Sequence, residues 1–531
     1  MKVALIVARD KKTNGIGYKN TIPWNDKTDM KWFKDITLGD GENTNVVIMG
    51  RKTYESLNGR VLGGRCNIVI THHPESITDN RIFTAPSVEE AIKLAYSYKC
   101  DSAFIIGGNT IYKQALDIAE SDEHLEVDTI YLTELDAPDN AKFDTYFKYD
   151  DIIDSTFTID KHMSKYYTDR YYFDKNVCNE INVLRRKYSH INETDKSYIK
   201  LIWDILDNGK LKDTRAGETT SVFGRMLRFD LRQGLPILTT KKVFSKGCIH
   251  ELLWFLKGDT NIKYLIDNNT HIWDDDAYRY FLQSILPYIP GLEAQSMSKE
   301  EFLTHVMNSD TVAYVHPTTK EITMYTYGDL GPVYGKQWVD WNGVNQIENL
   351  IHTLKTNPSD RRLLVSAWNV SEIKNMALPP CHYMSQWYTT EISENDRQAY
   401  TDGQYYYSTD ELDAMGIPKY YLSCMWHQRS VDTCLGFPYD LLSYSVLTTL
   451  VASTCNMIPY EVLCTLGDTH IYCNQFDSVY KQLDRNYNKY KLPRLELQKH
   501  NSNMDGWNYE DIKIIGYNSY KPVKYKLSVG L

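Results

Sequence analysis

Short runs of apolar residues recur along the first third of the chain. They lie at 3–8, 46–49, 67–71 and 103–106, and each has the length of a strand that is buried on both faces. Helical patterns of apolar and polar residues lie between these runs, for example at 87–96. Because buried strands that alternate with helices form parallel sheets, the pattern predicts an α/β domain with a central, mostly parallel sheet and flanking helices.

A polar, charged stretch without strong periodicity follows, and the strand pattern ends after about residue 173. We interpret 176–193 as a linker between a first domain at 1–175 and a second domain at 194–531. Separate domains are expected because a single hydrophobic core rarely grows beyond about 250–300 residues.

The second domain begins with an amphipathic helical pattern at 198–210, which Gly209 is expected to end. Two later stretches, at about 277–327 and about 391–421, are rich in acidic residues and tyrosine. We interpret both as insertions that lie on the surface between more regular elements.

Composition and charge narrow the range of functions. The chain has 531 residues and a net charge of −10, which argues against a nucleic-acid partner and leaves anionic substrates to a few placed arginines. It contains no run near the roughly 18 apolar residues of a membrane span and no signal-peptide core, so we expect a cytoplasmic protein without a membrane partner. The ten cysteines are scattered without metal-ligand spacing, which predicts a reducing compartment and no metal site.

An acid and an aromatic residue stand four positions apart at Asp29 and Phe33. In a helix both side chains share one face. The carboxylate could then hydrogen-bond the N–H pair of a flat heterocycle while the ring packs on it. The alternative is a solvated acid that the helix dipole favours in a first turn, and this segment by itself leaves both interpretations open.

Seven motifs around this segment occur in order and at consistent spacing. They are Gly15-Ile-Gly17, Pro23-Trp24 with Asp29 five residues on, Val47-Ile-Met-Gly50-Arg51-Lys-Thr53, Gly64-Arg65-Cys-Asn67-Ile-Val-Ile70, Ile106-Gly107-Gly108 with Tyr112, Tyr131-Leu-Thr133, and Phe143-Asp-Thr-Tyr-Phe147. Together they make residues 1–175 resemble dihydrofolate reductase.

This resemblance implies roles for the residues of a folate site. Asp29 would orient the pteridine and promote protonation of N5, and Thr133 would hydrogen-bond the Asp29 carboxylate. Arg65 would pair with the α-carboxylate of the folate glutamate, a task that suits a planar guanidinium. The other implied folate contacts are Phe33 and the backbone carbonyls of Ile6 and Ile106.

The same resemblance implies an NADPH site. Gly107 and Gly108 would let the backbone approach the diphosphate at a helix N-terminus. Arg51, Thr71 and His72 stand where the family binds the 2′-phosphate, which favours NADPH over NADH. The remaining implied cofactor contacts are Ala8, Ile16, Gly17, Lys52, Thr53 and Tyr112. Asn109, at a position that is often small in the family, is a departure that is expected to adjust the cofactor loop.

The second domain offers a possible nucleophile in Ala377-Leu-Pro-Pro-Cys381-His382. A lone cysteine is most often a small buried hydrophobe. The arginines at 361, 362 and 429 could instead lower the pKa of its thiol and bind a phosphate. Glu251 is available as an acid.

Motifs across 194–531 resemble thymidylate synthase. They are Phe223-Gly224, 236–242, 251–261, Ile272-Trp273-Asp274, 328–338, Asp360-Arg361-Arg362, Ser366-Ala-Trp-Asn369, Cys381-His382, 428–432, Leu435-Gly436 and Gly467-Asp-Thr-His470-Ile-Tyr472. The resemblance implies an α+β domain that dimerises through its sheet, and hence a homodimer.

By the same resemblance, Cys381 would add to C6 of the pyrimidine, so that C5 attacks the co-substrate 5,10-methylenetetrahydrofolate. Glu251 would manage protons through water, and Tyr334 would assist removal of the C5 proton. The products would be a 5-methyl nucleotide and dihydrofolate. The implied substrate contacts are Trp273, His382, Gln428, Arg429, Ser430, Asp432, His470 and Tyr472, with Arg361 and Arg362 reaching across from a second subunit.

Three positions depart from the synthase pattern. The phosphate loop reads Asp213-Thr-Arg215-Ala-Gly217, with the arginine one place late, and we still assign Arg215 to the phosphate. Asp276 stands where eukaryotic-type members carry Asn. Asp440 stands where synthases carry an Asn whose amide offers uracil one donor and one acceptor.

Asp440 leaves two bases open. A carboxyl group can accept from the 4-amino group of cytosine and, if protonated, donate to N3, and the related deoxycytidylate hydroxymethylases carry Asp here. Hydroxymethylation, however, makes no dihydrofolate for an attached reductase to use. The fusion therefore favours methylation of dUMP, with methylation or hydroxymethylation of dCMP as the alternative.

A different class of function is a second domain that serves only as a dimerisation scaffold or an RNA-binding module. Cys381, Glu251 and Arg429 are all present, and the chain is acidic. Both facts argue against this hypothesis.

Overall fold

A computed structural model describes residues 1–38, 44–98, 100–121, 127–172, 179–291, 297–401, 403 and 405–527. The chain forms two compact units. The first unit comprises Met1–Ile191 together with Tyr480–Lys491 and Tyr520–Val523, and the second comprises Asn192–Val479, Leu492–Ser519 and Lys524–Leu531. Each unit is described by itself below.

The elements up to residue 191 are those of an α/β domain. They are β1 Lys2–Asp10, β2 Gly15–Gly17, α1 Lys27–Leu38, β3 Val46–Gly50, α2 Arg51–Ser56, β4 Cys66–Ile70, β5 Ile82–Ala85, α3 Val88–Ser97, β6 Ser102–Ile105, α4 Asn109–Ser121, β7 Thr129–Leu135, β8 Thr145–Tyr146, α5 Asp150–Thr156, β9 Phe157–Ile159, α6 Lys161–Tyr171 and β10 Glu180–Arg186.

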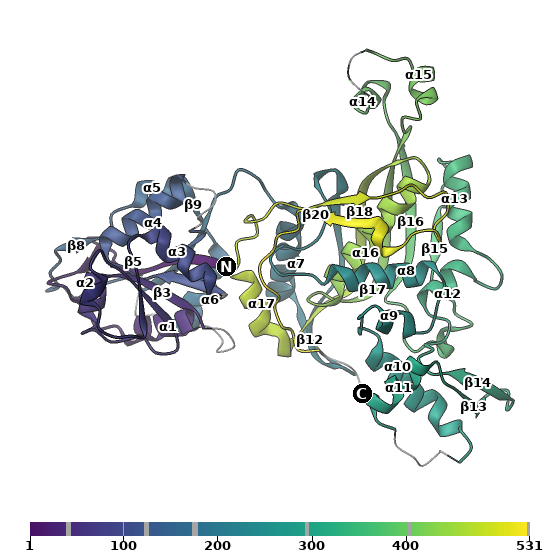
Figure 1. Cartoon of the computed structure of the whole chain (residues 1–531), viewed down its shortest axis with the longest axis horizontal. Coiled ribbons are helices and arrows are strands. Elements are labelled where there is room, and N and C mark those ends of the chain that lie inside the picture. The colour runs from purple at the N-terminus through teal and green to yellow at the C-terminus, as the bar shows by residue number, and fades with distance from the viewer. Residues whose placement is uncertain are drawn as a thin grey trace. The chain divides into compact units, whose positions relative to one another are not determined.

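An eight-stranded sheet forms the centre of the first unit, in the order β5-β4-β3-β6-β1-β7-β10-β9 (Figure 1). The strands from β5 to β7 in this order run parallel, and β10 runs antiparallel to both β7 and β9. The four predicted apolar runs form β1, β3, β4 and β6, and their side chains belong to one buried core with those of α3 and α4. The predicted α/β fold with a mostly parallel sheet is therefore confirmed.

The structure differs from the sequence prediction at the segment interpreted as a linker. Residues 176–178 lie outside the described ranges, but Glu180–Arg186 is strand β10 of the first unit's sheet. Ile181 and Val183 are fully buried there and alternate with more exposed residues, as expected of a strand. This short alternation was missed because charged residues surround it.

The elements from residue 192 onward are more varied. They are α7 Glu193–Asn208, β11 Lys210–Thr214, β12 Gly217–Asp230, α8 Ser245–Leu256, α9 Lys263–Asp267, α10 Asp274–Tyr280, α11 Lys299–Asn308, β13 Thr311–Val315, β14 Ile322–Thr326, α12 Tyr334–Val339, α13 Gln346–Thr356, β15 Leu364–Ser366, β16 His382–Glu391, α14 Glu394–Gln398, α15 Thr409–Ala414, β17 Tyr420–Asp432, α16 Gly436–Thr454, β18 Ile458–Tyr472, α17 Phe476–Leu483, β19 Arg494–Leu497 and β20 Ile512–Ile515.

A six-stranded mixed sheet, β11-β12-β18-β17-β16-β15, organises the second unit. Only the β17–β18 pair is parallel within its described ladders. Helix α16 packs on β17 and β18 and is buried along most of its length, with α8 packed against it. Helix α7 ends at Gly209, as predicted. Among the described residues, no helix combines the length and the apolar character that crossing a bilayer requires.

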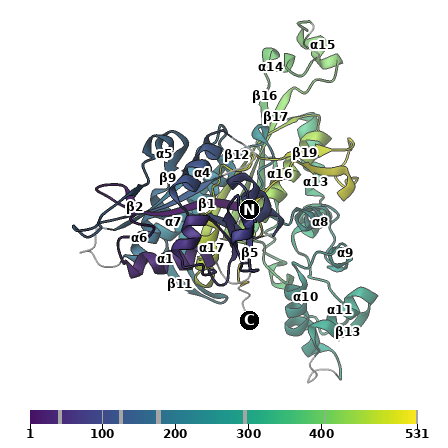
Figure 2. The same cartoon turned by 60° about the vertical axis from the view of Figure 1, so that its left-hand side comes forward.

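The two stretches interpreted as insertions contain regular structure. The stretch 277–327 holds α11 and the β13–β14 hairpin, and 391–421 holds α14 and α15. Figure 2 shows α14 and α15 beyond the ends of β16 and β17, away from the strands that form the middle of the sheet. Both stretches therefore leave the six-stranded sheet uninterrupted, and their interpretation as insertions stays a prediction.

A buried ionic cluster ties residues 480–491 into the first unit. The Asp484 carboxylate accepts hydrogen bonds from Lys2 Nζ at 2.5 Å, Tyr131 Oη at 2.5 Å and Arg185 Nη2 at 3.2 Å. Burial would raise the pKa of Asp484, but the cations of Lys2 and Arg185 outweigh burial and lower it. Asp484 therefore stays charged inside the unit. Lys489 Nζ donates to Asp128 at 2.8 Å in the same way.

We expect Asp484→Asn to destabilise the first unit by about 3–5 kcal/mol, because Lys2 loses its buried counter-charge and Arg185 keeps only Asp160. Faster hydrogen exchange in β7 and β10, followed by mass spectrometry, would report the loss. Since the folded pKa of Asp484 is lowered, this contribution is present at neutral pH and disappears as the pH falls through the acid range.

Asp139→Asn is a matched control, because the side chain of Asp139 is 100% exposed. Its exchange rates should equal those of the wild type. Equal exchange in the Asp484→Asn protein as well would show that the cluster does not hold the unit together.

Candidate active sites

The predicted folate residues of the first unit gather around the carboxyl ends of its central strands. Ile6 lies on β1, Ile106 follows β6, Thr133 lies on β7, and Asp29 and Phe33 lie on α1. In the sheet, the strand that follows β1 in the chain is β3, which lies on one side of β1. The strand that follows β6 is β7, which lies in the opposite direction across the sheet. The strand order therefore reverses between β6 and β1. Ligands of open α/β sheets bind in the crevice at such a switch point.

Asp29 has the surroundings of a proton-handling group. Burial raises the pKa of Asp29 to about 6, the hydrogen bond with Thr133 lowers it, and the nearby Asp26 raises it. Asp29 therefore exchanges its proton near neutral pH, where an acid–base group is most effective. Tyr112 Oη donates to the Ile6 carbonyl at 2.8 Å, which fixes the ring close to Asp29.

The glycine pair after β6 leaves room for a bound group. Gly107 has φ of 123°, a backbone conformation that favours glycine. A Cβ on Gly107 would lie 3.3 Å from Tyr112 Oη, and one on Gly108 would lie 3.4 Å from Thr53 Oγ1. Helix α4 begins directly after the pair, so its N-terminal N–H groups and dipole suit a diphosphate.

The other predicted cofactor residues lie at neighbouring strand ends. Arg51, Lys52 and Thr53 begin α2 directly after β3, and Thr71 and His72 follow β4. Arg51, Lys52 and His72 are exposed, so their charged or polar ends are open to an anion. Ala8 lies on β1, and Ile16 and Gly17 lie on β2.

Arg65 lies beside the C-terminal end of α1. Its Nη1 donates to Thr37 Oγ1 at 2.7 Å. Burial lowers the pKa of Arg65 slightly from its very high ordinary value, which leaves the guanidinium charged. It can therefore bind a carboxylate at the edge of the crevice.

The second site is built around Cys381, at the start of β16. Arg429 on β17 lies beside Cys381. The backbone N–H of Arg429 donates to the Cys381 carbonyl at 2.9 Å, and Nη2 of the Arg429 guanidinium lies 3.8 Å from Cys381 Sγ. The same guanidinium donates to the carbonyls of Pro379 and Pro380, both at 2.9 Å. The rigid Pro-Pro approach and Arg429 thus fix the position of the thiol.

A net lowering of the Cys381 pKa, one of the two possibilities that the sequence left open, does not occur. Burial raises the pKa of the thiol, and the cation of Arg429 lowers it by less. The carboxyl groups of Asp440 and Asp276 also raise it. The free protein therefore holds a thiol rather than a preformed thiolate.

Glu251 and Tyr334 complete the site. Burial raises the pKa of Glu251 to about 7, and the hydrogen bond from Trp273 Nε1 to Glu251 Oε1, at 2.6 Å, lowers it. Tyr334 Oη accepts the backbone N–H of Cys381 at 2.8 Å. The ring of Tyr334 lies 4.4 Å from that of His382. An acid that titrates near neutral pH and a nucleophile thus both lie close enough to Tyr334 to affect its pKa.

The predicted phosphate and ribose contacts are spread over β17, β18 and two loops. In the parallel β17–β18 pair, Ser430 faces Asp468 and Asp432 faces His470, which places this end of β17 beside the end of β18 that carries His470 and Tyr472. Arg215 lies in the exposed turn between β11 and β12, close enough to Asp276 and Tyr472 to affect their pKa values. The carboxylate of Asp276 itself pairs with Arg279.

Arg361 and Arg362 lie in an exposed loop before β15. Arg362 Nη2 contacts Asp360 Oδ2 at 2.8 Å, and the Arg362 side chain remains 88% exposed. Arg361 and Arg362 are therefore open toward solvent.

The structure shows a local role for Asp432, which the sequence assigned to the folate. Its Oδ1 accepts the N–H groups of Cys434 and Leu435 at 2.8 and 2.9 Å.

Two residues of this site were missed in the sequence. Tyr444 Oη hydrogen-bonds His382 Nδ1 at 3.0 Å, and Trp426 Nε1 donates to Gln428 Oε1 at 3.1 Å. Tyr444 stands four residues after Asp440 on α16, a spacing that places both on one helical face and could have identified it. Trp426 had no such signal.

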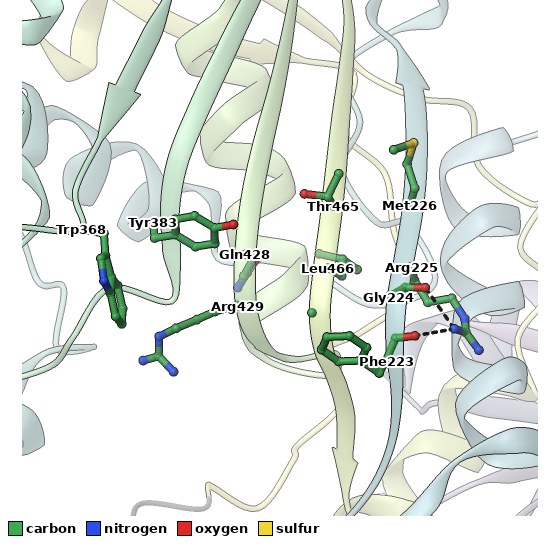
Figure 3. A pocket seen from close by; sticks show the side chains of 11 residues that line it. Phe223, Gly224, Arg225, Met226, Trp368, Tyr383, Gln428, Arg429, Thr465 and Leu466 are labelled. Atoms are coloured by element: carbon green, nitrogen blue, oxygen red, sulfur yellow. Dashed lines mark hydrogen bonds between the residues drawn. The ribbon is translucent and has the colours of Figure 1, made fainter. Parts of the chain in front are cut away.

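An open hollow of about 720 Å³ lies on the sheet of the second unit. Figure 3 shows Trp368, Tyr383 and Arg429 on one side of it and Phe223 on the other. Phe223 is 79% exposed and Met226 is 63% exposed, which is unusual for large apolar side chains so close together. Within the described ranges, no cluster of three or more His, Cys, Asp or Glu side chains could hold a metal.

Comparison with known proteins finds two enzyme families along the chain. Residues 2–177 match the dihydrofolate reductase family, and residues 196–529 match the thymidylate synthase family. The bifunctional dihydrofolate reductase-thymidylate synthase of Paramecium tetraurelia is 33% identical over 529 residues, which cover 97% of this chain and 96% of the relative.

Two further relatives are similar to nearly the whole chain and to one part of it, respectively. Bifunctional dihydrofolate reductase-thymidylate synthase 2 of Arabidopsis thaliana is 31% identical over 567 residues, covering 99% of this chain and 88% of the relative. The thymidylate synthase of Mycoplasma mobile is 40% identical over 337 residues, covering 63% of this chain and 100% of the relative.

The folds and the two sites define a fused enzyme of folate chemistry, with a reductase unit followed by a nucleotide-methylating unit. The chain belongs to the bifunctional dihydrofolate reductase–thymidylate synthase family. Members of the family use NADPH and 5,10-methylenetetrahydrofolate, and the predictions of both are confirmed.

We expect Trp273→Phe to raise the pKa of Glu251 above its value of about 7. The variant loses the N–H donor to the carboxylate, and a hydrogen bond to a charged group is worth about 1.5–3 kcal/mol, so the shift should be about one pH unit or more. The pH profile of dTMP formation measures it. Trp254→Phe is the control, because Trp254 Nε1 donates to the Asn261 carbonyl instead; equal profiles for both variants would contradict the assignment.

Proposed function

We propose that the first unit reduces dihydrofolate with NADPH and that the second unit converts dUMP and 5,10-methylenetetrahydrofolate to dTMP and dihydrofolate. The single observation that carries this proposal is the pair of buried acids, Asp29 and Glu251, whose pKa values burial raises to about 6 and about 7. Each lies beside the residues that the corresponding reaction needs. The second reaction makes the substrate of the first.

In the reductase unit, Gly107, Gly108 and the N-terminus of α4 would hold the NADPH diphosphate, and Arg51 and His72 would hold its 2′-phosphate. NADPH supplies the hydride when it is bound. Asp29 orients the pteridine through paired hydrogen bonds and promotes protonation of N5, supported by Thr133. Arg65 binds the glutamate carboxylate.

In the synthase unit, Cys381 adds to C6 of the base and makes C5 nucleophilic toward the methylene group of the folate. Because its thiol is protonated in the free protein, the proton has to leave as the nucleotide binds. Glu251 moves protons at the base and the folate through water, and Tyr334 assists removal of the C5 proton. The implied phosphate ligands are Arg215, Arg429 and Ser430, and the implied ribose ligands are His470 and Tyr472.

The named relatives favour dUMP over dCMP, because they are described as thymidylate synthases over the whole second half of the chain. A synthase that makes dihydrofolate also gives the fused reductase its substrate. We therefore retain dUMP as the nucleotide and do not propose dCMP.

We also propose that the protein is a homodimer that associates through the sheet of the synthase unit. The apolar side chains around the open hollow, including Phe223 and Met226, support this surface. The exposed Arg361 and Arg362 would then reach the phosphate site of the second subunit. A cytoplasmic location stays a prediction from the sequence.

The two activities should be separable by single substitutions. Cys381→Ser should reduce dTMP formation by about 10³-fold or more while NADPH oxidation with dihydrofolate is unchanged. Asp29→Asn should reduce NADPH oxidation by about 10²-fold or more and leave dTMP formation unchanged. The wild-type reductase rate should fall as the pH rises through about 6, and Asp29→Asn should lack that limb.

Asp35→Asn serves as the control for Asp29, since Asp35 is on the same helix and pairs with Lys31. The proposal would be overturned by a Cys381→Ser protein that still forms dTMP, or by an Asp29→Asn protein that reduces dihydrofolate at the wild-type rate.

Dimer formation should depend on the sheet surface. We expect Phe223→Asp to weaken self-association at least about tenfold, because it places a charge on an apolar interface. Light scattering during gel filtration measures the mass as a function of concentration. Ile322→Asp is the control, because Ile322 is 77% exposed on the β13–β14 hairpin. If both variants keep the wild-type mass, the proposed surface is wrong.

A further inference from the structure

The position that departs most from the synthase pattern, Asp440, lies inside the nucleotide site. It stands near the start of α16, close enough to Cys381 and Tyr334 to affect their pKa values. Its side chain is 17% exposed, and burial raises the pKa of Asp440 to about 8. The family reads uracil with an amide here, so the structure has to explain how a carboxyl group can take its place.

One oxygen of Asp440 is committed as a hydrogen-bond acceptor. Trp426 Nε1, which can only donate, donates to Gln428 Oε1 at 3.1 Å and so fixes the orientation of the Gln428 amide. The Gln428 Nε2 donor then points at Asp440 Oδ2, at 2.7 Å. Because an N–H faces Oδ2, a proton on the carboxyl group belongs on Oδ1.

The other oxygen faces a neutral neighbour. His382 Nε2 lies 3.8 Å from Asp440 Oδ1, while His382 Nδ1 hydrogen-bonds Tyr444 Oη at 3.0 Å. Burial lowers the pKa of His382 to about 3, so the imidazole carries no charge that could stabilise a carboxylate. A neutral acid is therefore compatible with both sides of Asp440.

The titratable groups around Asp440 come from every element that packs against it, and most are neutral or anionic. They are Glu251 and Cys248 on α8, Tyr334 on α12, Cys381 and His382 at β16, Cys464 on β18 and Tyr444 on α16 itself. The cation of Arg429 lies beside Cys381. Glu251 raises the pKa of Asp440 further.

We propose that Asp440 recognises the N3–H and O4 edge of uracil as a neutral carboxylic acid, with Oδ2 accepting from N3–H and the Oδ1 hydroxyl donating to O4. A carboxylic acid then offers the same donor and acceptor pair as an amide. A carboxylate would offer two acceptors and would repel O4. This inference rests on the proposed reaction with dUMP and names the group that selects its base.

The same arrangement disfavours cytosine. In the same position, cytosine would place its 4-amino donor against the Oδ1 hydroxyl and its N3 lone pair against Oδ2. Reversing the acid would put a proton on Oδ2, against the N–H of Gln428. Gln428 therefore acts as a positioning residue that sets which base the acid accepts.

The affinity of the protein for dUMP at pH 6.5 and 8.5, below the range in which uracil itself ionises, tests the proposal. Equilibrium dialysis without folate separates binding from chemistry. With a pKa of about 8, the neutral fraction of Asp440 and hence the affinity should fall about fourfold between these pH values. Asp440→Asn carries an amide that does not titrate, so its affinity for dUMP should not show the fourfold fall.

2-Deoxyribose 5-phosphate, which lacks the base, provides a second control on the wild-type protein alone. Its affinity should not follow the fourfold fall, because it does not reach Asp440. This comparison decides the question even if Asp440→Asn does not fold. The wild type should also bind dUMP more tightly than dCMP at pH 6.5.

Equal losses of dUMP affinity in wild type and Asp440→Asn, a wild-type affinity that does not fall, or tighter binding of dCMP would each overturn the inference. If dTMP still forms from dUMP in those cases, the proposed function stands, and only the proposed role of Asp440 in recognising the base is wrong. If folded wild-type protein instead makes a modified dCMP and no dTMP, the proposed function fails with it.

Discussion

Removal of carboxyl groups from water is the constraint on which the chemistry of both units depends. Asp29, Glu251 and Asp440 would each be fully ionised at neutral pH if they were solvated. Burial raises their pKa values to about 6, about 7 and about 8 respectively. Each fold therefore has to enclose an acid without pairing it with a cation, since a nearby cation would return the pKa to its ordinary range.

The partners of a buried acid decide whether it titrates near neutral pH or stays charged as part of the fold. Asp484 is buried as deeply, but Lys2 and Arg185 keep it charged. Asp29 and Glu251 instead receive single hydrogen bonds, from Thr133 and from Trp273, which lower their pKa values only in part. The same side-chain type thus stabilises a fold in one place and titrates near neutrality in another, according to the charge of its neighbours.

The two units bring distant residues together by different geometry. In the reductase unit, parallel strands end at one edge of the sheet, so short motifs after β1, β3, β4 and β6 meet without long side-chain reach. In the synthase unit, neighbouring strands β16, β17 and β18 place Cys381, Arg429 and His470 within one site. The reductase site therefore follows from the order of the strands in the sheet. The synthase site follows from the residue-by-residue register of neighbouring strands.

The sequence by itself determined the elements and motifs whose signal is local. The apolar runs predicted β1, β3, β4 and β6, and Gly209 ended α7 as expected. It did not predict β10, whose pairing with β7 supplies the burial that a short alternation cannot show. The sequence also did not predict that residues 480–491 belong to the first unit. An ion pair between residues 482 positions apart leaves no local pattern in the chain.

The nucleotide site shows the same division. Most of its residues were recognisable one by one in the sequence, including the exchange at Asp440, but Tyr444 and Trp426 were not. The net direction of the Cys381 pKa was not, because the desolvation that outweighs Arg429 comes from several elements at once. Nor was the amide orientation of Gln428, which Trp426 decides. Residue identity is a property of the chain, whereas burial and hydrogen-bond direction exist only once the chain has packed, and these decide which form each acid takes.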